Sequence, residues 1–140
     1  MIQFFYENLP ETVNTEYTKW LEDLIISEGK KPGEINYIFS DDEYLLKVNQ
    51  DYLQHDYYTD IITFDYVKGK TISGEIFVSL QRISDNASTL SKSYEEELRR
   101  VLAHGVLHLC GYKDKTEEQE QEMRRKEDVY LAKYLKEFNF

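Results

Sequence analysis

Cysteine, proline and long apolar runs are scarce in this chain of 140 residues, and each shortage excludes a class of protein. The single cysteine, Cys110, can form neither an internal disulfide nor a cysteine-rich metal cluster, which is typical of a reducing compartment. No run approaches the roughly 20 apolar residues that span a bilayer, and the first residues lack the features of a secretory signal. We therefore expect a soluble, cytoplasmic protein that makes no membrane contact.

Linkers and repeats are also missing. Only two prolines interrupt the sequence, and no Gly/Ser-rich or low-complexity stretch marks a boundary. Apolar residues make up 41% of the chain and aromatic residues 14%, which is enough to build a core. The length and this composition predict a single domain over residues 1–140.

Positive charge is in deficit, with 17 Lys and Arg against 27 Asp and Glu, a net charge of −10. Such a balance argues against nonspecific binding to nucleic acid or to anionic membranes. The deficit is uneven, because residues 61–115 carry eight basic and seven acidic side chains, a net of +1. This middle segment is where an anionic ligand would be tolerated.

Hydrophobic periodicity predicts strands and helices in the order β-α-β-α-β-β-α-α-α. The first expected helix has Asn14 as its N-cap, and a turn is expected at Pro32 and Gly33. The second expected helix begins at Ser40 or Asp41. This order predicts an α+β domain with a small mixed sheet covered by helices. The expected strands are 2–6, 35–39, 61–64 and 71–79, and the later helices are 80–90, 94–110 and 117–138.

The most informative stretch is HGVLHLCGYKD, at residues 104–114. His104 and His108 are one helical turn apart, so both imidazoles project from the same side and can hold one metal ion. Gly111 stands where the helix should end, and a left-handed glycine there would turn Asp114 back toward the histidines. Three protein ligands with one open coordination position are typical of catalytic zinc, and a carboxylate among them lets manganese compete better.

Each of these residues also has a structural interpretation, and both stay open at this point. A buried histidine often only satisfies a carbonyl group, and Asp114 or Thr116 can cap the last helix. Gly105 implies that something lies close to the helix backbone beside His104. The same glycine occupies the position of the general base in the HExxH motif, which argues against a peptidase of that type.

Taken together, these motifs resemble the YbeY family, bacterial rRNA maturation factors that act as metal-dependent, single-strand-specific endoribonucleases. HGVLHLCGYKD matches the family signature H-G-x-L-H-L-x-G-Y-D-H at seven positions, and the likeness extends through most of the chain. Further matches are Asn49, Tyr52, the run Thr59 to Phe64, Gly74 to Ile76, Met123 and Glu127.

The resemblance implies a compact α+β domain with a four-stranded sheet and about five helices, somewhat like the metzincin core. It implies one divalent ion, zinc first and manganese or nickel as alternatives, held by His104, His108 and Asp114, the last in place of a family histidine. The implied activity is cleavage of single-stranded rRNA in ribosome biogenesis and quality control, including maturation of the 3′ end of the small-subunit rRNA. The implied partners are the ribosome or small-subunit proteins.

One departure concerns the substrate. Leu53 stands where the family has an arginine associated with RNA, so catalytic competence depends on other groups. Candidate substrate-binding residues are Arg82, Arg99 and Tyr112, with Arg100 and Tyr66 as further possibilities, although an arginine on a helix is often only a solvated charge. A noncatalytic, metal-binding ribosome-assembly factor stays an alternative, and a metallopeptidase a more remote one. No catalytic residue is predicted beyond the metal site.

Overall fold

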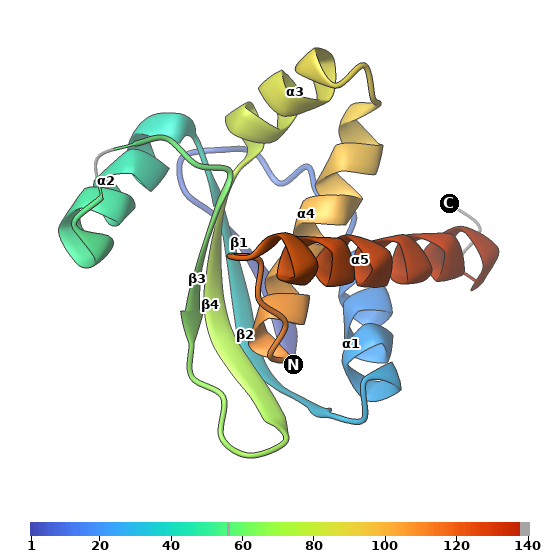
Figure 1. Ribbon diagram of the computed structural model, residues 1–140. Coiled ribbons are helices and arrows are strands. Elements are labelled where there is room, and N and C mark those ends of the chain that lie inside the picture. Colours follow the sequence, from blue (N-terminus) through green and yellow to red (C-terminus); the bar gives the residue numbers. More distant parts are fainter. Residues whose placement is uncertain (56, 138–140) are drawn as a thin grey trace.

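A mixed four-stranded sheet organises the computed structural model, which describes residues 1–55 and 57–137 (Figure 1). Its strand order is β1-β2-β4-β3, with β1, β2 and β4 parallel and β3 antiparallel to β4. The described elements follow the order that the sequence predicts, and the fold class is confirmed. They are β1 (Ile2–Tyr6), α1 (Tyr17–Ser27), β2 (Lys31–Ser40), α2 (Asp42–Leu53), β3 (Ile61–Asp65), β4 (Thr71–Ser79), α3 (Leu80–Thr89), α4 (Tyr94–Leu109) and α5 (Glu117–Glu137).

The two faces of the sheet are covered by different helices. Alternate residues of the central strands, such as Tyr37, Phe39 and Ile76, are fully buried in the main core beneath α1 and α4. On the opposite face, α2 places Leu45 and Val48 against Ile62 of β3 in a second, smaller cluster. Helix α5 then packs across α4 (Figure 1), and Trp20 Nε1 donates to the carbonyl of Tyr130 at 3.1 Å, which joins α1 to α5.

Two local expectations are corrected. Pro32 and Gly33 do not form a turn, because β2 already begins at Lys31 and a bulge lies between Pro32 and Ile35. Pairing with β1 starts only at Ile35, so Pro32 lies where β2 has a neighbour on one side alone, as a strand proline requires. Asn14 precedes α1 and is not its N-cap, because the helix begins at Tyr17 and Glu16 holds the cap position. The Asn14 side chain accepts from Glu16 N at 2.9 Å in the turn before the helix.

Other helix ends agree with the sequence. Asp41 is the N-cap of α2 and accepts a hydrogen bond from Tyr44 N at 2.9 Å, which decides between the two residues considered. The predicted end of the last helix at Phe138 lies outside the described residues. In the part of the chain that the structure covers, every helix is too short or too polar to cross a bilayer.

Candidate metal centre

Two imidazoles project from the C-terminal half of α4. The rings of His104 and His108 have centroids 4.5 Å apart and planes at 84°. Between them, Gly105 lies against the sheet, where an added Cβ would be 3.1 Å from side-chain atoms of Ile61 and Ile76. The close contact that the sequence implied beside His104 is therefore the packing of α4 on β3 and β4.

The chain reverses directly after α4. Gly111 has a φ of +111°, and its N–H donates to the carbonyl of His108 at 3.0 Å. The reversal brings Asp114 back to the helix, so that its Oδ2 lies 3.3 Å from Nε2 of both histidines. The structure thus brings together the three residues that the sequence proposed as ligands.

The donor atoms fit a divalent ion. One donor from each of the three residues lies within 4.8 Å of the other two. Nδ1 of His104 faces Glu127 Oε2 at 2.7 Å, and Nδ1 of His108 faces the carbonyl of Tyr112 at 2.9 Å. Because each Nδ1 faces an acceptor, it carries the ring proton and leaves the Nε2 lone pair directed at the shared centre, as in zinc sites.

The cap of the last helix, α5, is formed by Thr116 and not by Asp114. Thr116 Oγ1 accepts from Gln119 N at 3.1 Å, while Gln119 Oε1 accepts from the backbone N–H of Thr116 at 3.2 Å. This reciprocal pair is a capping box for α5. Asp114 is therefore not needed as a helix cap, and its carboxylate is available to the two imidazoles.

Glu127 anchors the centre from α5. Its side chain is 6% exposed, and it accepts hydrogen bonds from His104 through Oε2 and from Arg100 through Oε1, the latter at 2.8 Å. Burial alone would raise the pKa of Glu127, but the bonds from His104 and Arg100 outweigh it and hold that pKa below its usual value. The carboxylate therefore stays ionised and fixes both the orientation and the tautomer of His104.

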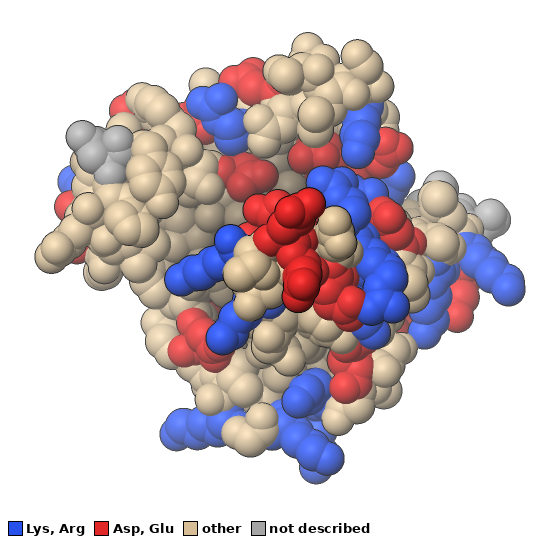
Figure 2. Space-filling view, viewed as in Figure 1, with Lys and Arg blue, Asp and Glu red and all other residues tan. Residues whose placement is uncertain are grey.

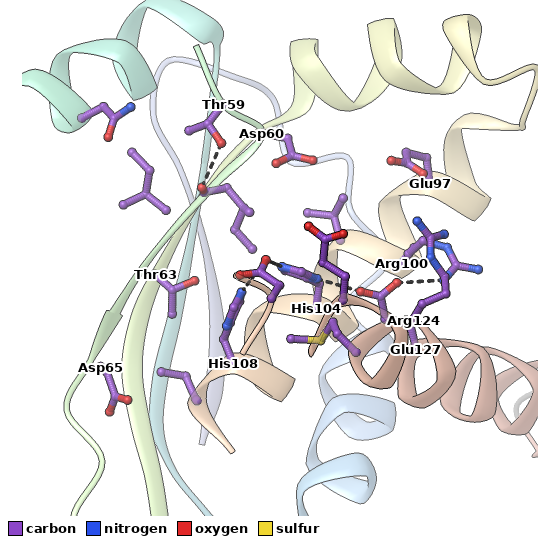
Figure 3. Close-up of a pocket in the computed structure, with 18 of the residues that line it drawn as sticks. Thr59, Asp60, Thr63, Asp65, Glu97, Arg100, His104, His108, Arg124 and Glu127 are labelled. Atoms are coloured by element: carbon purple, nitrogen blue, oxygen red, sulfur yellow. Dashed lines mark hydrogen bonds and ion pairs between the residues drawn. The ribbon is translucent and has the colours of Figure 1, made fainter. Parts of the chain in front are cut away.

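The three residues open into a cleft of about 1040 Å³ between β3, α4 and α5 (Figure 3). Asp60 and Glu97 point into it from opposite walls, and burial raises the pKa of both carboxyl groups. Figure 2 shows acidic side chains gathered where α5 begins, in the middle of the view. Among the described residues, the arginines that line the cleft are Arg100 and Arg124.

Comparison with known proteins identifies the family. The family model described as endoribonuclease YbeY matches residues 4–135. The chain belongs to the YbeY family. Two curated relatives, both named endoribonuclease YbeY, are from Flavobacterium johnsoniae, 56% identical over 96% of this chain and 97% of the relative, and from Flavobacterium psychrophilum, 52% identical over 94% of each. The solution structure of TM1509 from Thermotoga maritima is similar with a TM-score of 0.73 at 26% identity, covering 99% of this chain and 92% of that one.

Three other residues that the sequence suggested for substrate binding lie away from this YbeY cleft. Arg82 forms an ion pair with the buried Asp42 at 2.6 Å, and the Arg99 guanidinium lies 5.0 Å from the ring centre of Tyr134. The hydroxyl of Tyr112 donates to Glu28 at 2.5 Å. None of the three is among the described residues that line the cleft, whereas Leu53 is, with 40% of its surface exposed.

Sequence reasoning did not show that Glu127 contacts His104 or that Asp60 lines the cleft. Glu127 matched the YbeY pattern, but its pairing with His104 joins positions 23 residues apart and no local spacing reveals it. Glu95 accepts from Tyr17 at 2.5 Å, and Glu97 lines the cleft.

Proposed function

We propose that this protein is a metal-dependent endoribonuclease that cleaves single-stranded RNA, with rRNA or its precursor as the substrate. The observation that carries the proposal is the convergence of His104, His108 and Asp114 within 4.8 Å at the floor of an open cleft. The names of the family and of its curated relatives support the same activity. The proposed role lies in ribosome biogenesis, with maturation of the small-subunit rRNA 3′ end as one step and the ribosome or its small-subunit proteins as partners.

The three residues would hold one divalent ion, and zinc is our first choice because two imidazoles and one carboxylate are ordinary zinc ligands. When bound, such an ion polarises a phosphoryl oxygen and makes a water molecule more acidic. The chain itself contributes the orientation of the ligands. Glu127 and the Tyr112 carbonyl each face an Nδ1 atom, and these two contacts aim both Nε2 atoms at one point.

A phosphodiester cleavage also needs a group that accepts a proton. Asp60 is the candidate on the β3 side of the cleft, which it lines together with His104. Burial raises the pKa of Asp60 above the usual aspartate value, which makes its carboxylate a stronger base than one in open solvent. Asp60→Asn should therefore lower the rate about 100-fold or more while metal binding is retained.

The experiment compares cleavage of a labelled single-stranded oligoribonucleotide by the wild type and by variants at Asp114, His104 and Asp51. Asp114→Asn should abolish cleavage, and chelation of the wild type should do the same until zinc or manganese is restored. Asp51→Asn is the matched control, because Asp51 is an exposed carboxylate on α2 outside the cleft. Cleavage that survives both Asp114→Asn and His104→Ala would reject the proposal.

A further inference from the structure

An exposed pair of aromatic rings lines the same cleft as the metal centre. The rings of His55 and Tyr57 are stacked, with centroids 5.2 Å apart and planes at 20°, and the Tyr57 hydroxyl lies 3.0 Å from His55 Nδ1. Both residues line the cleft that holds His104 and His108. Tyr57 keeps 56% of its surface exposed, so its ring is not part of the core.

One buried residue, Asn49, hydrogen-bonds to backbone groups of both His55 and Tyr57. Asn49 is 2% exposed, its carbonyl accepts from His55 N at 3.1 Å, and its side-chain amide donates to the carbonyl of Tyr57 at 3.0 Å. Gln54, at the end of α2, has a φ of +57°, which directs the chain into this position. Backbone groups of His55 and of Tyr57 are therefore both anchored to Asn49.

Neighbouring tyrosines do not share this arrangement. Tyr58 donates to Glu43 at 2.7 Å and lies beneath the Arg82 guanidinium. Tyr52 is 71% exposed, but it packs edge-on against Phe64 and does not line the cleft. Within the described part of residues 52–58, the rings that line the cleft are thus those of His55 and Tyr57.

The charge of the cleft indicates how a nucleic acid would bind there. Asp60, Asp65 and Glu97 line it, Arg100 is already paired with Glu127 and Asp128, and the other arginine among the described lining residues is Arg124. Few phosphate contacts are therefore available for affinity. A sequence-tolerant alternative is stacking, because every base has a π-face that can lie on an aromatic ring.

We infer that the His55 and Tyr57 pair is a stacking platform for an unpaired base of the RNA strand whose phosphodiester lies at the metal centre. This inference rests on the proposed function. A duplex covers its base faces with neighbouring pairs, so the platform selects single strands.

The test measures binding of a single-stranded oligoribonucleotide containing 2-aminopurine to metal-free protein in chelator, so that cleavage does not interfere. Tyr57→Ala and His55→Ala should each raise the Kd about 5- to 150-fold, the range that corresponds to loss of one stacked base. Tyr57→Phe and His55→Phe keep the rings and should bind within about twofold of the wild type, because stacking needs only the aromatic face. Tyr52→Ala is the matched control and should leave the Kd unchanged.

The outcomes separate this inference from the proposed function. If the wild type cleaves the oligonucleotide but Tyr57→Ala and His55→Ala bind it as the wild type does, the platform is rejected and the nuclease stands. Equal losses in Tyr52→Ala would also reject it, since that ring lies outside the cleft. If the wild type neither binds nor cleaves RNA, both proposals fail. Quenching of 2-aminopurine that depends on Tyr57 supports stacking directly.

Discussion

The hydroxyl of Tyr112 donates a 2.5 Å hydrogen bond to Oε1 of Glu28, a residue 84 positions earlier in the chain. Glu28 follows α1, and its other carboxylate oxygen accepts from Tyr130 and, at 3.3 Å, from Lys126 Nζ, both on α5. The backbone carbonyl of Tyr112 in turn faces His108 Nδ1. The loop after Gly111 is thus fixed at its side chain by Glu28, and its backbone orients one of the proposed metal ligands.

Two phenylalanine substitutions separate these roles. Tyr112→Phe and Tyr130→Phe each remove one donor to Glu28, and each should cost about 1.5–3 kcal/mol of unfolding free energy, since the acceptor is charged. Only Tyr112→Phe should also weaken zinc binding, severalfold. The backbone carbonyl of Tyr112 faces His108 Nδ1, and loss of the hydroxyl contact with Glu28 loosens the loop that carries this carbonyl. Denaturation curves and competition with a zinc-binding dye measure the two effects. Equal zinc affinities in the two variants would show that Glu28 acts on stability alone.

Glu28 also predicts a pH dependence of stability. Burial would raise its pKa, but hydrogen bonds from Tyr112 and Tyr130 together with Lys126 bring the pKa below the usual value of 4.5. A carboxyl group with a depressed folded-state pKa stabilises the protein above its unfolded-state pKa, and this contribution is lost as the pH falls through the folded-state pKa.

Glu28→Gln should therefore be less stable than the wild type near neutral pH, with the difference shrinking as the pH falls below about 4.5. Thermal unfolding at a series of pH values measures this difference in stability. Glu34→Gln is the control, because Glu34 is an exposed residue of β2. A difference that is constant from acid to neutral pH would mean that the charge of Glu28 contributes nothing.

Glu127→Gln tests the anchoring of the other histidine. Loss of the carboxylate removes the partner that fixes the orientation of His104, and such losses typically weaken metal binding about 10- to 100-fold. Asp128→Asn is the matched control, because Asp128 also accepts from Arg100, at 2.8 Å, but is 57% exposed and contacts neither histidine. Isothermal titration with zinc compares the two variants. Similar losses in both would assign the effect to Arg100 instead.

Local sequence patterns predicted the frame of this site well. The spacing of His104 and His108, the stop at Gly111 and the apolar periodicity of α4 are all short-range features, and the structure follows them. Asp114 needed one further step, because its place depends on the path of the loop. That path follows from the left-handed conformation at Gly111, which the residue type itself suggested.

The supporting contacts could not be predicted in the same way. The sequence alone favours a solvated helix charge for Arg82. In the fold, the buried Asp42, 40 residues earlier, lies against it. Glu28, Glu127 and the partners of Tyr112 are likewise joined by tertiary packing over tens of residues. Side-chain pairs of this kind depend on how helices cross, and periodicity within one helix carries no information on crossing.

The salt dependence of RNA binding follows from the cations of the cleft. Arg100 and Arg124 are the arginines among its described lining residues, and no lysine is among them. Neutralising one phosphate of a single strand contributes a slope of about −0.7 to log K against log salt. Because Arg100 is paired with Glu127 and Asp128, Arg124 is left for one such contact, and the expected slope is about −0.7. Titrations of metal-free protein between low and moderate salt should therefore show a shallow slope, which Arg124→Gln reduces further, while Tyr57→Ala lowers affinity without changing the slope. A slope steeper than about −3 would mean that phosphate contacts outside the cleft dominate, because the cleft itself cannot supply so many.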